Sequence, residues 1–154
     1  MVQCRSWADE RLATLVREFA AEDPERIAPT VSETGPIAPP HQVLLLTRGD
    51  EAVGYVYGKT VHAASAWDGP RLHHLYLIRE LRGQGRGLGA KMVTQWCSRF
   101  RARHTAFSVL SPNGSMKEVL RKLGAKLLHH MQEADNCAQT TEFYLLERQQ
   151  EDGA

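Results

Sequence analysis

The first part of the chain alternates between helical and extended patterns of apolar residues. Between Trp7 and Ala21 the apolar positions recur every three to four residues, which predicts an amphipathic helix with Ser6 as its N-cap. A strand is predicted before this helix, from Val2 to Arg5, and two strands after it, over residues 42–47 and 52–61. The buried stripe of the helix is predicted to consist of Leu12, Leu15, Val16 and Phe19.

The rest of the chain predicts further strands and helices, with no repeat and no second domain. Residues 23–40 hold five of the seven prolines and predict a loop. The whole chain, residues 1–154, is therefore expected to form one domain, with a polar tail at 148–154 that frays. The remaining predicted elements are a strand at 72–78, a helix at 88–100, a strand at 106–110, a helix at 115–123 that stops at Gly124, and strands near 126–131 and 140–146.

Composition narrows the class of protein without naming a function. A chain of 154 residues with 42% apolar content suits one domain with an ordinary core. Three cysteines are an odd number without paired spacing, which argues against a disulfide framework. The sequence begins with no signal peptide pattern and has no apolar run near 18 residues, so we expect a cytoplasmic protein that does not contact membranes.

A glycine-rich turn between the strand at 72–78 and the helix at 88–100 is the clearest chemical feature. Glycines stand at four alternate positions, so backbone N–H groups are left uncovered where the helix begins. Those donors and the positive end of the helix dipole favour a phosphate or pyrophosphate group. Seven Lys and Arg residues and no carboxylates lie between Leu81 and Lys117, which supports a polyphosphate ligand. The four glycines are Gly83, Gly85, Gly87 and Gly89.

Two common nucleotide-binding motifs do not fit this turn. Gly85-x-Gly87-x-x-Ala90 matches a dinucleotide fingerprint by letter, but the acidic residue expected about 20 positions later is missing. A Walker-type loop requires Gly-Lys-Ser/Thr, where this chain has Ala90-Lys91-Met92. Nucleic acid is not expected as a partner, because the net charge is only +1 and no aromatic residues interleave the basic ones.

A third motif fits. Arg82-x-x-Gly85-x-Gly87 resembles the signature of the GNAT-type N-acetyltransferase superfamily, and the order of the predicted elements agrees with that family. Ser111-Pro112-Asn113, followed by a helix that closes at Gly124, resembles a later part of the same pattern. The resemblance implies an α/β (α+β) fold: a central mixed, mostly antiparallel sheet of six to seven strands, flanked by helices and splayed at the signature strand.

The resemblance also implies a co-substrate, acetyl-CoA, and no metal. The glycine turn would bind the CoA pyrophosphate, and the pantetheine arm would pair with the signature strand as an added strand does. The acidic residues Glu22, Asp23, Glu25 and Glu33, and also Glu133 and Asp135, are candidates for attracting a cationic amine on the acceptor side. Solvated surface carboxylates are an equally good interpretation of each. The residues expected to bind the cofactor are Leu75, Leu77, Arg82, Gly83, Gln84, Gly85, Arg86, Gly87, Leu88 and Asn113.

The catalytic positions depart from the family pattern. The position that often carries a tyrosine acid is Leu120, and one that often carries a carboxylate or tyrosine is Arg71. Substitutes lie in the signature strand, where His73 or His74 could accept the ammonium proton and Tyr76 could act as the acid. Because adjacent strand residues point to opposite faces, one histidine should face the cleft unless a bulge intervenes. Another family position that sometimes supplies histidine is Ser108.

Two functions from different classes remain. The first is transfer of an acetyl group from acetyl-CoA to a primary amine, on a small molecule or a peptide, by direct attack. The second is a catalytically silent acyl-CoA-binding or sensing domain, which the departures at Leu120 and Arg71 keep open. The strands near the C-terminus could pair two copies into a homodimer. The identity of the acceptor is beyond what the sequence indicates.

Overall fold

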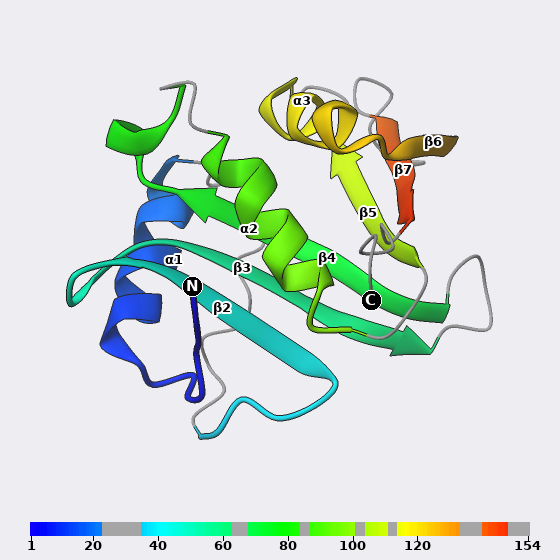
Figure 1. Cartoon of the computed structure of the whole chain (residues 1–154). Coiled ribbons are helices and arrows are strands. Elements are labelled where there is room, and N and C mark those ends of the chain that lie inside the picture. Colours follow the sequence, from blue (N-terminus) through cyan, green and yellow to red (C-terminus); the bar gives the residue numbers. More distant parts are fainter. Residues whose placement is uncertain are drawn as a thin grey trace, which may run out of the picture.

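The computed structural model describes residues 1–22, 35–62, 68–83, 87–100, 104–110, 114–132 and 140–147. Seven strands in this part of the chain form one sheet in the order β1-β2-β3-β4-β5-β7-β6 (Figure 1). The elements are β1 (Val2–Gln3), α1 (Glu10–Glu22), β2 (His41–Arg48), β3 (Glu51–His62), β4 (Asp68–Leu77), the 3₁₀ helix η1 (Arg79–Leu81), α2 (Leu88–Cys97), β5 (His104–Leu110), α3 (Gly114–Leu123), β6 (Lys126–Gln132) and β7 (Thr140–Glu147).

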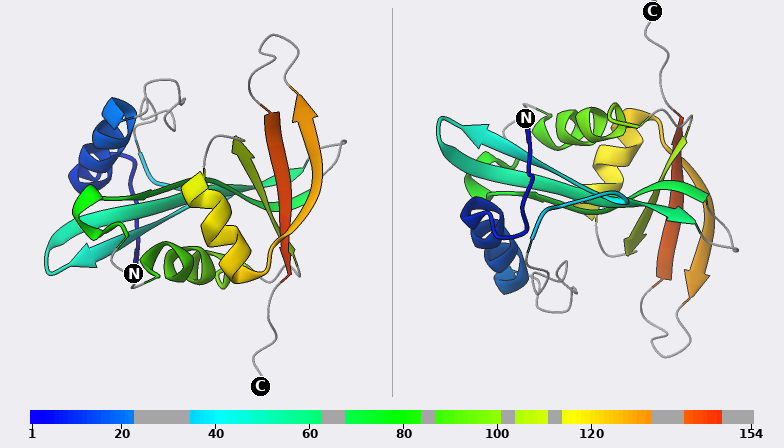
Figure 2. Two further views of the ribbon diagram at one scale, coloured as in Figure 1. Left: turned by 90° about the horizontal axis from the view of Figure 1, so that it is seen from above. Right: turned by 90° about the horizontal axis from the view of Figure 1, so that it is seen from below.

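The sheet consists of two antiparallel parts that meet at a parallel pair. Strands β1 to β4 pair in sequence order, and β7 lies between β5 and β6. The parallel contact between β4 and β5 is recorded at two residue pairs, Arg71 with Ala106 and Leu72 with Phe107. Beyond them the strands diverge, and β6 and β7 run across the direction of β2 to β4 (Figure 2). The predicted mixed, mostly antiparallel sheet that splays at the 72–78 strand is therefore confirmed.

Helix α1 buries the predicted stripe but begins later than predicted. Leu12, Leu15, Val16 and Phe19 are all buried, as expected. The N-cap is Asp9 rather than Ser6, because Asp9 Oδ1 accepts a hydrogen bond from the Arg11 N–H at 2.9 Å. Ser6 instead forms a bridge with Pro36, and its Oγ accepts from the Ala8 N–H in the turn before the helix. The backbone from Trp7 to Ala8 is therefore a turn, and Ser6 cannot cap the helix.

Helices cover both faces of the sheet and create two cores. On one face α1 packs over the aromatic residues of β3 and β4, with Phe19 against Tyr55 and Tyr76 at centroid distances of 6.4 and 5.2 Å. On the other face α2 contributes Val93 and Trp96, both fully buried, and α3 contributes Leu120. Figure 1 shows α1 and α2 on opposite sides of the strands.

The ends of the other elements lie within three residues of the predicted ones, except that β4 begins at Asp68, four residues before the predicted strand. Helix α2 stops at Cys97 rather than at residue 100, because the Arg99 and Phe100 N–H groups bond three residues back and tighten the last turn. The ring of Phe100 still packs on Trp96 at 4.6 Å, which explains why it fits the helical pattern. No helix in the described part of the chain is long and apolar enough to cross a membrane.

Candidate functional site

The glycine turn lies between β4 and α2 at the point where the sheet divides. It begins with η1, continues through Arg82 and Gly83, and leads to Gly87, the N-cap of α2. Gly83 and Gly87 have φ angles of 69° and 63°, a left-handed conformation that favours glycine. The predicted cofactor residues Gln84, Gly85, Arg86 and Asn113 fall outside the described residues.

The N-terminus of α2 offers backbone donors and little that competes with an anion. No side chain caps this helix, and its first turn contains no acidic residue. The N–H groups of Leu88, Gly89 and Ala90 belong to the first turn, where a helix supplies no partner of its own. The positive end of the helix dipole lies at the same place. This helix end therefore suits a phosphate group, as the sequence predicts.

The start of α2 also packs closely on the rest of the site. A Cβ added to Gly89 would lie 3.2 Å from Cγ2 of Val119 on α3 and 3.9 Å from Cδ2 of Leu75 on β4. The helix can approach both elements because position 89 has no side chain. Close packing thus explains the fourth glycine of the turn, whereas backbone conformation explains Gly83 and Gly87.

One edge of β4 is left open beside this helix. The Ile78 N–H bonds to the Val53 carbonyl oxygen of β3 at 2.9 Å. Because peptide groups of a strand alternate between its two edges, the peptide groups of Leu75 and Leu77 point away from β3, toward the side from which β5 diverges. The carbonyl oxygen of Leu77 accepts a 2.6 Å hydrogen bond from Nε of Arg82 on that side. The open edge of β4 begins after Leu72 and runs toward the glycine turn.

A β-bulge in β4 brings both candidate histidines to one face. In the ladder with β3, Tyr57 pairs with His74 and the next residue, Gly58, pairs with Leu72, so His73 is the extra residue. Both imidazoles lie against the ring of Tyr57, at centroid distances of 5.8 and 5.9 Å. The bulge therefore overrides the alternation that would have placed one histidine on each face, and both lie on the α1 side of the sheet.

His73 is held in its neutral form. Burial, followed by the positive charges of Arg71, His74, Lys59 and His41, lowers its pKa from 6.5 to about 4. Its Nε2 atom is buried and has no hydrogen-bond partner among the described residues. A buried ring nitrogen that is uncharged at neutral pH can accept a proton from a bound ligand.

Tyr57 connects His73 and His74 to a third histidine, His41. Its hydroxyl group lies 2.8 Å from Nδ1 of His41, and the two rings stack at 5.9 Å. The indole of Trp7 packs edge-on against both rings. Sequence reasoning missed Tyr57, His41 and Trp7, because only the strand register reveals that they surround the bulge.

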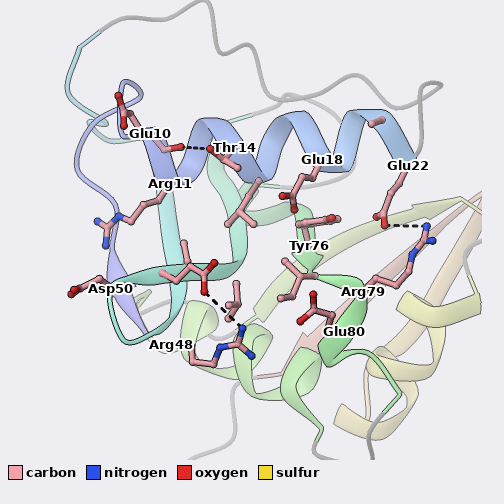
Figure 3. Close-up of a pocket in the computed structure, with 16 residues that line it drawn as sticks. Glu10, Arg11, Thr14, Glu18, Glu22, Arg48, Asp50, Tyr76, Arg79 and Glu80 are labelled. Atoms are coloured by element: carbon pink, nitrogen blue, oxygen red, sulfur yellow. Dashed lines mark hydrogen bonds and ion pairs between the residues drawn. The ribbon is translucent and has the colours of Figure 1, made fainter.

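Tyr76 lies on the same face but in a different environment. It lines a cavity of about 690 Å³ along α1, together with Glu18 and Glu22 (Figure 3). Burial, followed by the charges of Glu22 and Glu18, raises the pKa of the Tyr76 phenol. The histidines are not part of the lining of this cavity. The expected role of Tyr76 as an acid therefore stays a prediction.

The structure also shows where Leu120 and Arg71, the positions that depart from the family pattern, lie. Leu120 is fully buried in the core beneath α3. Arg71 lies where β4 contacts both β3 and β5, and burial lowers the pKa of its guanidinium group. The side chain of Ser108 is outside the described part. Among the described residues, no group of three or more His, Cys, Asp and Glu side chains is placed to hold a metal ion.

Two predicted ligand contacts are instead bound to each other. Arg82 was expected to contact the cofactor and Glu22 to attract an amine. In the structure Nη2 of Arg82 lies 2.6 Å from Oε2 of Glu22, and Arg79 approaches the other carboxylate oxygen at 3.3 Å. Of the other acidic candidates, Asp23, Glu25, Glu33, Glu133 and Asp135 fall outside the described residues.

Comparison with known proteins identifies the fold. The sequence matches no protein-family model and no curated protein. A solved structure of a GNAT-family protein from Desulfovibrio desulfuricans is 14% identical, covers 96% of this chain and 99% of its own, and has a TM-score of 0.72. The aminoglycoside 6'-N-acetyltransferase from Enterococcus faecium is also 14% identical, with coverages of 98% and 99% and a TM-score of 0.70.

A third similar structure holds the expected co-substrate. The structure of yncA from Salmonella typhimurium, solved with its cofactor acetyl-CoA, is 17% identical, covers 73% of this chain and 67% of its own, and has a TM-score of 0.54. The chain therefore has the fold of the GNAT-family acetyltransferases.

Proposed function

We propose that this protein transfers an acetyl group from acetyl-CoA to a primary amine by direct attack. The observation that carries the proposal is a coincidence of three features where β4 and β5 separate. These are an uncapped helix N-terminus, an open strand edge, and a bulge that directs two imidazoles to one face. Each feature has a distinct use in the reaction.

Acetyl-CoA would lie along the open edge of β4 and end at α2. Gly83 to Leu88 would surround the pyrophosphate, and the backbone of Leu75 and Leu77 would pair with the pantetheine arm. Asn113 is proposed as a further contact with the cofactor. That acetyl-CoA is bound to yncA, which has a similar fold, supports acetyl-CoA as the co-substrate.

The proposed reaction needs one base and no covalent enzyme intermediate. The amine nitrogen attacks the thioester carbon, and a strand amide stabilises the negative oxygen of the tetrahedral intermediate. The carbon–sulfur bond then breaks, coenzyme A leaves as the thiolate, and the proton from the amine goes to His73 or His74. The thiolate takes a proton from Tyr76 or from water. His73 is neutral at pH 7 because its pKa is lowered to about 4, which leaves its ring nitrogens able to accept a proton but only weakly basic.

The acceptor is proposed to be a small-molecule or peptide amine. The aminoglycoside acetyltransferase with a similar fold supports a small-molecule acceptor. The outer edge of β6, the last strand of the sheet, is the proposed position for a second copy in a homodimer. That the protein works in the cytoplasm, without nucleic acid or membranes, also stays a prediction.

A two-stage experiment tests this function. Thermal melts with and without millimolar acetyl-CoA should show a rise on the order of 5–10 °C, which corresponds to ligand at about 100 times its dissociation constant. Thiol release should then be followed with a panel of polyamines, aminoglycosides, amino acids and peptide N-termini. A melting rise without release for any amine would favour the silent acyl-CoA-binding domain. No rise, even after bound CoA is removed, would contradict both functions.

A further inference from the structure

We propose that Glu22 is a positioning residue for acetyl-CoA, which holds the glycine turn in place through Arg82. The inference rests on the proposed function and assigns the signature arginine a different partner. Arg82 would then act on the cofactor indirectly, by fixing the backbone that leads to Gly83. Glu22 is the last residue of α1, 60 positions from Arg82 in the sequence.

The contacts of Arg82 connect three elements. Its Nη2 atom donates to Oε2 of Glu22 at 2.6 Å, and its Nε donates to the carbonyl oxygen of Leu77 at 2.6 Å. The guanidinium group thus joins the end of α1, the end of β4 and the start of the glycine turn. Arg79, in η1, reaches Oε1 of Glu22 at 3.3 Å (Figure 3). Each carboxylate oxygen of Glu22 therefore holds a different arginine of the same connection.

The ring of Tyr76 lies against the guanidinium group of Arg82 and belongs to the same group of contacts. The guanidinium carbon of Arg82 lies 5.2 Å from the centre of the Tyr76 ring, within the range of a cation–π contact. The charge of Glu22 contributes to the raised pKa of the Tyr76 phenol. The Glu22 side chain is 24% exposed and that of Arg82 is 41% exposed, so the pair is partly shielded from solvent. Glu22, Tyr76, Arg79 and Arg82 therefore form one connected cluster.

Two described residues of the turn, Gly83 and Gly87, have no side chain that could hold the backbone in place. A Cβ added at either position would meet no atom within 4 Å, so it would face open space. The absence of side chains at these glycines exposes N–H groups to an anion and also leaves this part of the backbone without side-chain packing. Among the described residues, Arg82 is the side chain of the turn that ties it to α1.

The competing interpretation is that Arg82 itself binds a phosphate. The two interpretations predict opposite effects when the charge of Glu22 is removed. If Arg82 binds phosphate directly, Glu22 competes for it, and Glu22→Gln should strengthen acetyl-CoA binding. If Arg82 positions the turn through Glu22, the same substitution should weaken binding.

The test is a double-mutant cycle on acetyl-CoA affinity, measured by titration calorimetry. We expect Glu22→Gln and Arg82→Gln each to weaken binding roughly tenfold, as for loss of a charged hydrogen bond. The double variant should be no weaker than either single variant, because the two residues act as one unit. Glu118→Gln is the matched control: its carboxylate pairs with Arg121 on α3, and its loss should leave affinity unchanged.

Further measurements separate positioning from a general structural role. In Glu22→Gln the KM for acetyl-CoA should rise by a larger factor than kcat or the KM for the amine changes. Glu22→Asp keeps the charge and should recover part of the affinity; it also replaces Glu22→Gln should that variant fail to fold. Unchanged or tighter binding in Glu22→Gln, or fully additive effects in the cycle, would overturn the inference. Failure of the unmodified protein to bind acetyl-CoA would instead refute the proposed function.

Discussion

The indole of Trp96 on α2 lies directly against the backbone of Gly58 on β3. A Cβ added to Gly58 would lie 2.3 Å from Cζ2 of Trp96 and 2.5 Å from the carbonyl oxygen of Arg71. Trp96 is fully buried, and Gly58 is the residue that follows Tyr57 at the bulge. The same short stretch of β3 therefore accepts α2 on one face and the histidine bulge on the other.

The first prediction concerns this contact. Gly58→Ala should destabilise the protein by about 1–3 kcal/mol or more, because neither the indole nor the backbone carbonyl can move away easily. Chemical denaturation measures this change. The unmodified protein is the reference, and Gly49→Ala in the β2–β3 turn shows the cost of replacing a left-handed glycine where a Cβ meets nothing within 4 Å. A midpoint for Gly58→Ala equal to that of the unmodified protein would show that α2 can shift off β3.

The second prediction concerns the anion site at α2. Gly87→Val should weaken acetyl-CoA binding strongly, because a branched side chain strains the left-handed backbone and covers the N–H groups of the helix. Gly49→Val is a matched control with nearly the same φ, 64° against 63°, and open space around it. Titration calorimetry compares the two. Equal affinities would place the phosphate away from the N-terminus of α2.

The third prediction separates chemistry from cofactor binding. The double variant His73→Ala/His74→Ala should lower turnover by about 10²-fold or more while acetyl-CoA affinity stays unchanged, since general base catalysis contributes ~10²–10⁴-fold. Thiol release at saturating amine measures turnover. The single variants then assign the base, because both imidazoles lie on the same face. His104→Ala, on β5, is the control. Full turnover in the double variant would exclude both histidines as the base.

The fourth prediction follows from the lowered pKa of His73. Between pH 6.5 and about 4 the unfolded chain protonates this histidine and the folded protein does not, so folding becomes less favourable as the pH falls through that window. His73→Gln should flatten the decline of the melting temperature there. Carboxylates also contribute to acid unfolding, but the difference between the two melting curves isolates His73. Parallel curves would mean that the imidazole is accessible to solvent in the folded state.

The sequence predicted the parts of the fold that depend on local patterns. The stripe of α1, the turn after β4 and the stop of α3 at Gly124 each depend on residues close together in the chain. The N-cap of α1 was assigned to the wrong residue because the choice between two candidate caps depends on a contact that is distant in the sequence. Ser6 and Asp9 are both good caps by type, and only the distant bridge from Ser6 to Pro36 excludes Ser6.

The candidate site was predictable in its backbone and not in its side chains. Glycine spacing alone indicates an anion site, because the chemistry lies in the peptide groups. The bulge at His73 is set by the register of two strands, and no residue in the sequence marks it. The pairing of Glu22 with Arg82 joins two segments that no local pattern connects. Sequence reasoning therefore named Arg82 but not its contact with Glu22.

The parallel contact of β4 with β5 also has a consequence for the order of folding. Strands β1 to β4 pair with neighbours that follow one another along the chain, and β5 to β7 form a second set. The two sets are joined through the β4–α2–β5 crossover, whose closure is slow compared with formation of the hairpins β2–β3, β3–β4 and β6–β7. The open edge of β4, beside the diverging β5, takes its final form only after the two sets of strands have docked. During refolding, the moment at which the protein begins to bind ligand therefore marks the docking of the two sets of strands. Signals from helices and hairpins report the steps before docking.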